Sequence, residues 1–176
     1  MKRILFIQNP IAGRHHRKLQ KKEVEEFFKD DTYIEIATTR APADATRIVS
    51  ERLDDFDIFV AVGGDGTVNE CLSGFYDSEG NRISASAFAV IYTGTSPDFC
   101  KSYNIPLDYK DAIKLILYGN KKNISVGRIR HYNAFDDSLN GKYLNQVDKK
   151  YITSYFACCA NIGIGASIAR NANNGI

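Results

Sequence analysis

The sequence predicts an α/β fold, in which helices cover a parallel β-sheet and the beginning of an antiparallel β segment follows. Three observations carry this prediction. Short apolar segments alternate with amphipathic helical segments up to about residue 120, the pattern of a parallel sheet with crossover helices. A glycine-rich turn directly follows one of the apolar segments. Beyond residue 122 the helical pattern stops, and extended segments replace it.

The first predicted elements follow one another in regular order. Residues 3–8 are an apolar strand that ends in the turn Asn9-Pro10-Ile11-Ala12-Gly13. The polar segment 14–29 carries spaced apolar residues and is predicted to be a surface helix. Residues 33–38 are predicted to be a second strand and 43–53 a second helix.

The next elements surround the glycine turn. Residues 57–62 are a continuous apolar run typical of a buried strand, and the turn leads into a helix that ends at about Gly74. Residues 88–92 form the fourth strand. Ser96 is predicted to cap the helix after it, with Pro97 at the first helical position.

A domain boundary is predicted after the last helix, 108–118. Residues 1–122 would form the α/β domain and 123–176 an incomplete β-rich domain. The elements expected in the second part are an extended segment at 124–135, a hairpin turn at Asn140-Gly141 and strands at 143–147 and 151–160.

Composition excludes several classes of protein. The 176 residues carry a net charge of +2, which gives no reason to expect nucleic-acid binding. No apolar run is long enough to cross a membrane. The four cysteines lack metal-site spacing, so we expect reduced thiols and a cytoplasmic protein. The basic run Arg14–Lys18, with Lys21 and Lys22, has two readings: it attracts phosphates or an anionic membrane, or it is a solvated helix face.

The strongest candidate site is the run Val62–Glu70. Its three glycines, Gly63, Gly64 and Gly66, let a ligand come close to the backbone, and the helix that follows presents free N–H groups. Asp65, the one charged side chain among them, suits Mg²⁺ held together with phosphate oxygens. Thr67 and Glu70 also fit the spacing of a capping box, which is a purely structural reason for Glu70.

Other turns are predicted to lie at the same edge as this loop, because the carboxyl ends of parallel strands meet at one edge of a sheet. Asn9 and Gly13 follow the first strand, Thr39 follows the second, and Gly94 and Thr95 follow the fourth. Asn9, Gly13 and Thr39 also have a structural interpretation as ordinary turn residues. Asp98 is a candidate for catalysis or, alternatively, a carboxylate on the helix dipole.

These motifs together resemble the diacylglycerol kinase catalytic domain family, which also holds sphingosine kinases and bacterial lipid kinases. A more distant resemblance is to NAD kinases and phosphofructokinases, and Val68-Asn69-Glu70 favours the lipid kinase branch. The resemblance implies a Rossmann-like nucleotide-binding domain that uses ATP and Mg²⁺ to phosphorylate a lipid hydroxyl of a diacylglycerol-like or sphingoid acceptor. It implies catalytic roles for Asp65 and Asp98 and a metal role for Asp65. The residues implied in nucleotide binding are Asn9, Gly13, Thr39, Gly63, Gly64, Asp65, Gly66, Thr67, Asn69, Glu70, Gly94 and Thr95.

The sequence departs from the family pattern at a few positions. Pro97 replaces an asparagine, Cys100-Lys101 replaces Ala-Arg, and Ser125 stands where many members carry an acidic residue. The resemblance places the general base in an Asp-Gly-Glu-type motif beyond Ile176, so we expect a fragment that is inactive alone.

The expected partners are a nucleotide and a lipid acceptor, with the protein peripheral at the inner membrane surface and a homodimer left open. The alternatives are a soluble enzyme of the NAD kinase type, which an assay with NAD would identify, and a non-catalytic nucleotide-binding module.

Overall fold

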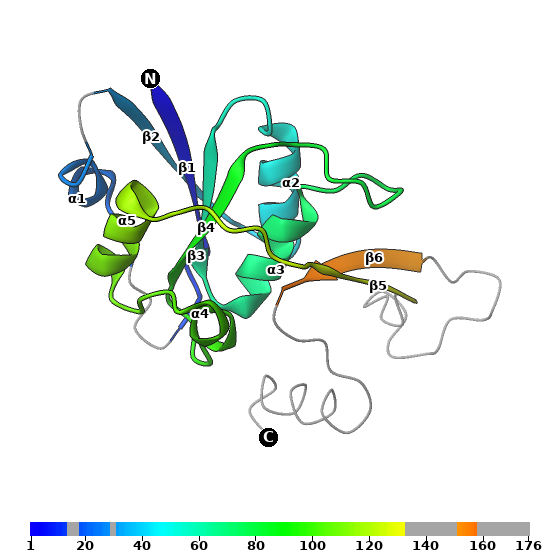
Figure 1. The fold of residues 1–176 in the computed structure, drawn as a ribbon. Helices are drawn as coiled ribbons and strands as arrows, with labels where there is room; N and C mark the ends of the chain where they lie inside the picture. The colour runs from blue at the N-terminus through cyan, green and yellow to red at the C-terminus, as the bar shows by residue number, and fades with distance from the viewer. Residues whose placement is uncertain (14–17, 29–30, 133–150, 158–176) are drawn as a thin grey trace.

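The computed structural model describes residues 1–13, 18–28, 31–132 and 151–157 (Figure 1). Four parallel strands form its central sheet, as the sequence predicts: β1 (Lys2–Gln8), β2 (Thr32–Thr38), β3 (Ile58–Gly63) and β4 (Ala87–Tyr92). Their order in the sheet is β2-β1-β3-β4, so β1 and β3 are central. Every residue of β3 is buried, which explains its uninterrupted apolar sequence.

Helices cover both faces of this sheet. One face packs against α2 (Asp44–Glu51), α3 (Asp65–Ser73) and α4 (Asp98–Tyr103). The other packs against α1 (Lys21–Glu25) and α5 (Tyr109–Tyr118). No helix within the described ranges is both long and apolar enough to cross a bilayer.

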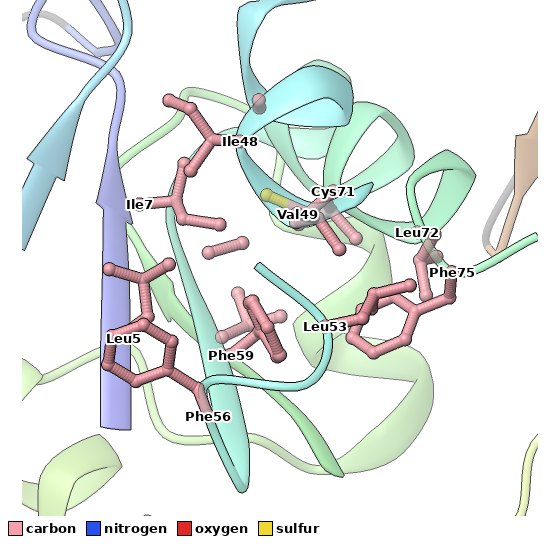
Figure 2. Packing of buried hydrophobic residues seen from close by; sticks show 14 of the residues in the cluster. Leu5, Ile7, Ile48, Val49, Leu53, Phe56, Phe59, Cys71, Leu72 and Phe75 are labelled. Carbon is pink, nitrogen blue, oxygen red and sulfur yellow. The ribbon is translucent and has the colours of Figure 1, made fainter. Parts of the chain in front are cut away.

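Alternate residues of the central strands feed two hydrophobic cores. In β1, Leu5 and Ile7 join the core under α2 and α3, while Ile4 and Phe6 face α1 and α5. Figure 2 shows the first core, in which the rings of Phe59 from β3, Phe56 just before β3 and Phe75 just after α3 pack between the sheet and its helices. This packing fixes the start of α3, and with it the glycine loop, against the end of β3.

A second, antiparallel sheet pairs β5 (Gly127–Tyr132) with β6 (Tyr151–Phe156). It rests on α3 and the segment after it, as Figure 1 shows. The ring of Tyr155 stacks on Tyr76 with centroids 4.3 Å apart, and the Tyr155 amide donates to the Ser73 hydroxyl oxygen over 3.3 Å. The predicted change from parallel to antiparallel structure is therefore confirmed within the described residues.

Two local predictions are wrong. Of the surface helix predicted at 14–29, the described residues 18–28 are helical over Lys21–Glu25, and residues 18–20 are irregular. The Leu19 amide donates to the side chain of Gln8 over 2.6 Å, a tertiary contact that ties this segment to β1 instead. The helix after β4 begins at Asp98 with Pro97 at its cap position, and no side chain caps it.

Several expected elements lie outside the described residues. These are the hairpin turn at Asn140-Gly141, the strand at 143–147, the ends of the segments 124–135 and 151–160, the basic residues 14–17, and Cys158 and Cys159.

Candidate functional site

The carboxyl ends of the strands meet at one edge of the sheet, as predicted. Backbone pairing continues one residue past the ends of β1 and β4: the Asn9 amide donates to the Val62 carbonyl and the Thr93 amide to the Gly63 carbonyl, each over 2.9 Å. The turns after β1, β3 and β4 are thus held side by side.

The glycine loop runs directly into α3. Gly64 is the N-cap residue, and its carbonyl accepts the Val68 amide over 3.0 Å. Gly66, in the first turn of α3, is exposed, and no atom beyond its chain neighbours and the backbone of its own helix lies within 4 Å of where its Cβ would be. The first turn of α3 is therefore open to an anionic ligand. The capping box predicted at Thr67 and Glu70 is wrong, because α3 begins at Asp65 and places Thr67 inside the helix.

A side-chain hydrogen bond joins the turn after β1 to α3. The Asn9 amide nitrogen donates to the Thr67 hydroxyl oxygen over 3.1 Å, and Thr67 is 6% exposed. The Asn9 carboxamide oxygen accepts the Ile11 amide over 3.1 Å, which forms the turn itself. Asn9 thus bonds through both ends of its amide group and fixes the β1 turn on α3.

Glycines let the three turns approach one another closely. Gly13 has φ +77°, and a Cβ there would overlap the Thr93 carbonyl oxygen. A Cβ on Gly94 would lie 2.6 Å from the Gly64 Cα. The loops after β1, β3 and β4 therefore pack backbone against backbone.

The Asp65 carboxylate carries the negative charge of this region. Burial and the nearby Asp65 charge raise the pKa of the Tyr92 hydroxyl to about 12 and that of the Cys100 thiol to about 11. The Asp65 charge therefore acts on a residue at the end of β4 and on one in α4. The Tyr92 hydroxyl donates to the Ser96 carbonyl. This bond joins the two ends of the turn that follows β4.

Tyr92 is a site residue that the sequence reasoning missed. The available signal was a large hydroxyl-bearing ring at the end of an apolar strand, next to a turn of small residues.

The remaining predicted residues fall into two groups. Thr39 lies at the same edge, and its amide and hydroxyl donate to the Gln8 carbonyl over 2.9 and 3.4 Å. Thr95 and Asp98 are exposed, in the β4 turn and the first turn of α4.

Asn69 and Glu70 lie further along α3. The Asn69 side-chain oxygen accepts the Ala157 amide over 3.4 Å, and the Glu70 carbonyl accepts the Thr46 hydroxyl over 2.8 Å. These contacts are structural, and a nucleotide role for either residue stays a prediction.

The side chains at this edge suit a metal ion that binds both the protein and a ligand. They do not suit an ion whose ligands all come from the protein. Within the described ranges, no three His, Cys, Asp or Glu side chains are grouped so that they could hold a metal ion. Mg²⁺ commonly takes one or two carboxylates together with phosphate oxygens and water. Asp65, at the foot of an open helix N-terminus, fits that arrangement.

Residues 3–129 match the family model of the diacylglycerol kinase catalytic domain. The chain belongs to this family. It is 35% identical over 133 residues to a diacylglycerol kinase of Bacillus subtilis (strain 168), an alignment that covers 73% of this chain and 42% of that protein. It is 29% identical over 135 residues to a protein of Klebsiella pneumoniae (strain 342) named probable lipid kinase YegS-like, covering 76% and 44%.

The fold of this chain agrees with that of a solved diacylglycerol kinase structure. A diacylglycerol kinase crystal structure from Bacillus anthracis strain Sterne matches with a TM-score of 0.53 and 27% identity, over 75% of this chain and 48% of that one. The chain thus spans less than half the length of these family members. Residues 3–129, which match the family model, contain the whole sheet edge described above.

Proposed function

We propose that this chain forms the nucleotide-binding part of an ATP-dependent lipid kinase. The observation that carries the proposal is the convergence of three glycine turns, after β1, β3 and β4, on the open N-terminus of α3. Backbone N–H groups and a helix N-terminus are a phosphate-binding arrangement. The membership of the chain in the diacylglycerol kinase family supports this reading.

Each part of the edge has a role in this proposal. The amides of Gly64, Gly66 and Thr67 bind phosphate oxygens, and the β4 turn at Gly94 and Thr95 forms the opposite lip. Asn9 fixes the β1 turn on α3 through its bond to Thr67. Asp65 holds Mg²⁺, which neutralises charge on the phosphates.

The proposed reaction is transfer of the γ-phosphoryl group. A lipid hydroxyl oxygen forms a bond to the γ-phosphorus, the bond to the β–γ bridging oxygen breaks, ADP leaves, and the hydroxyl proton passes to a base. Such catalysis depends mainly on positioning and charge stabilisation. The acceptor we propose is a diacylglycerol-like or sphingoid lipid, presented to a cytoplasmic protein at a membrane surface. Asp98, exposed at the start of α4, is the residue we propose to face the acceptor.

Nucleotide binding to the chain is the first test. We expect saturable binding of ATP in the presence of Mg²⁺, weakened roughly tenfold or more by Asp65→Asn, which removes the metal-binding charge. Asp54→Asn removes an exposed carboxylate outside the candidate site and serves as the matched control. Equal binding by both variants and the parent chain would remove Asp65 from the site.

Phosphoryl transfer distinguishes the functions. Labelled ATP is supplied with diacylglycerol, sphingosine or NAD as acceptor, both to this chain and to a full-length protein that contains it. Label in a lipid supports the proposal, whereas label in NAD indicates the NAD kinase type. ATP binding with no transfer by the full-length protein indicates a nucleotide-binding module.

A further inference from the structure

The outer face of α5 combines exposed apolar and basic side chains. Leu115 is 42% exposed and Tyr118 is 78% exposed, although the opposite side of the same helix, at Ala112 and Ile113, is buried in the core. Residues 115 and 118 are three apart and so lie on one face of the helix. Large apolar side chains this exposed have no role in the core of the described domain.

Lysines surround this apolar pair. Lys110 and Lys114 lie on the same outward side of α5, and Lys121 and Lys122 follow just after its end. All four are exposed. Residues 108–122 carry four lysines and two aspartates, which leaves a net charge of +2. Asp108 caps the helix by accepting the Lys110 amide, and Asp111 pairs with Lys114 over 2.8 Å.

We propose that this surface, called here the α5 surface and made of Lys110, Lys114, Leu115, Tyr118, Lys121 and Lys122, docks the protein on an anionic lipid bilayer. An aromatic and an aliphatic side chain beside several lysines are typical of interfacial helices, because the rings enter the headgroup region while ammonium groups meet anionic lipid. The charge of the surface is complementary to such a bilayer.

A bilayer suits this surface better than a folded protein partner. A stable protein interface buries about 800 Å² on each partner and excludes charge from its centre. The α5 surface instead offers two apolar side chains with lysines on their flanks. A shallow, charged contact of this kind is what a headgroup region accepts.

The α5 surface lies on the helix that leads away from the candidate site. α4 begins directly after the β4 turn, and α5 follows α4 after residues 104–108 and packs on β4, the edge strand of the sheet (Figure 1). The start of α5 is therefore the part of this helix nearer to the edge where we place ATP. This relation rests on the proposed function, although the docking itself can be measured without it.

A tryptophan reporter tests the docking, since the chain contains no tryptophan. Tyr118→Trp places one on the α5 surface, and Tyr33→Trp places one on β2, the opposite edge strand, where Tyr33 is 40% exposed. With vesicles of phosphatidylcholine and phosphatidylglycerol, we expect a blue shift of emission from Trp at 118 and none at 33. With phosphatidylcholine alone, we expect neither.

Charge variants give a second readout. Each lysine near an anionic surface contributes about a fivefold change in binding, so Lys121→Gln with Lys122→Gln should lower partitioning onto anionic vesicles roughly 25-fold. Lys21→Gln with Lys22→Gln removes the same charge from α1 and should change partitioning by a few-fold at most. Equal losses from the two pairs would overturn the proposal.

Three further results of these experiments would test the bilayer docking. A blue shift at position 118 that grows with protein concentration without vesicles would assign the surface to a second copy of the chain and overturn bilayer docking. Equal shifts with neutral and anionic vesicles would contradict the charge argument. ATP binding, measured without vesicles, reports the proposed function separately: a chain that binds ATP but not vesicles loses only the docking proposal, and the reverse result loses only the proposed function.

Discussion

The side-chain amide of Asn9 donates a 3.1 Å hydrogen bond to the hydroxyl oxygen of Thr67, joining two segments 58 residues apart in the sequence. This bond connects the end of β1 to the first turns of α3. Both segments also carry predicted nucleotide contacts. The bond therefore holds these predicted contacts at a fixed separation from one another.

Thr67→Val should destabilise the protein by about 1–2 kcal/mol, because it removes a buried hydroxyl and leaves the partly buried side-chain amide of Asn9 without this acceptor. Urea denaturation measures the change. Thr38→Val alters an exposed threonine in β2 and should stay within about 0.5 kcal/mol of the parent. A Thr67→Val protein as stable as the Thr38→Val control would show that the bond contributes nothing.

Two glycine substitutions should separate folding from nucleotide binding. Gly66→Ala adds a methyl group where space is open and should leave stability unchanged or raise it by up to about 1 kcal/mol, while blocking close approach of phosphate. Gly94→Ala brings a methyl group within 2.6 Å of the Gly64 Cα and should cost about 1–3 kcal/mol as well as nucleotide affinity. Calorimetry of unfolding and of ATP binding distinguishes the two, and unchanged ATP binding by Gly66→Ala would argue against phosphate at this helix.

The two central strands, β1 and β3, could be predicted from the sequence because they are buried on both faces and so appear as continuous apolar runs. The predicted strand at 57–62 is observed at Ile58–Gly63, and the one at 3–8 at Lys2–Gln8. The helix predicted at 14–29 could not be limited to Lys21–Glu25 in this way. Its apolar spacing is helical, but the hydrogen bond from Leu19 to Gln8 that competes with the helix is a tertiary contact.

The site was predictable in its location and less so in its detail. Asn9, Gly64 and Gly94 each follow the carboxyl end of a strand. Because the strands are parallel, these ends meet at one edge of the sheet. The bond from the Ala157 amide to Asn69, across 88 residues of sequence, depends on how the second sheet packs on α3. No short motif carries that information.

The stability of the protein in acid should depend on Glu35. The Arg52 guanidinium bonds to both oxygens of this carboxyl, over 2.5 and 2.9 Å, and lowers the pKa of Glu35 below its ordinary value. The ionised form is thus favoured in the folded state, so the contribution is complete above pH 4.5 and is lost as the pH falls through the lowered pKa.

Glu35→Gln should therefore lower stability at neutral pH by about 1 kcal/mol and flatten the loss of stability in acid. Thermal unfolding over an acid series measures both effects. Glu25→Gln, in a more exposed pair with Lys21 at 3.6 Å, is the control and should keep the acid profile of the parent. If Glu35→Gln keeps the parent's full acid dependence, the pair with Arg52 is not its source.

The contact of Tyr155 with α3 should determine whether the β5–β6 sheet stays attached to the α/β domain. Tyr155 is 6% exposed, stacks on Tyr76 and donates its hydroxyl to the Asp77 carbonyl over 3.5 Å. Tyr155→Ala removes this buried ring and should cost about 3 kcal/mol. Tyr151→Ala, at the other end of β6 where the side chain is 46% exposed, should cost under about 1 kcal/mol.

Hydrogen exchange can locate the effect of Tyr155→Ala. If the two sheets are separate units, as the sequence boundary near residue 122 predicts, amides of β5 and β6 should lose protection while those of β1 and β3 keep it. Loss of protection in all four strands would instead show that the sheets unfold as one unit and would contradict a boundary there. In either case the Asn69–Ala157 bond, which lies at the same contact, should break with the stacking, and its loss is measurable as faster exchange of the Ala157 amide.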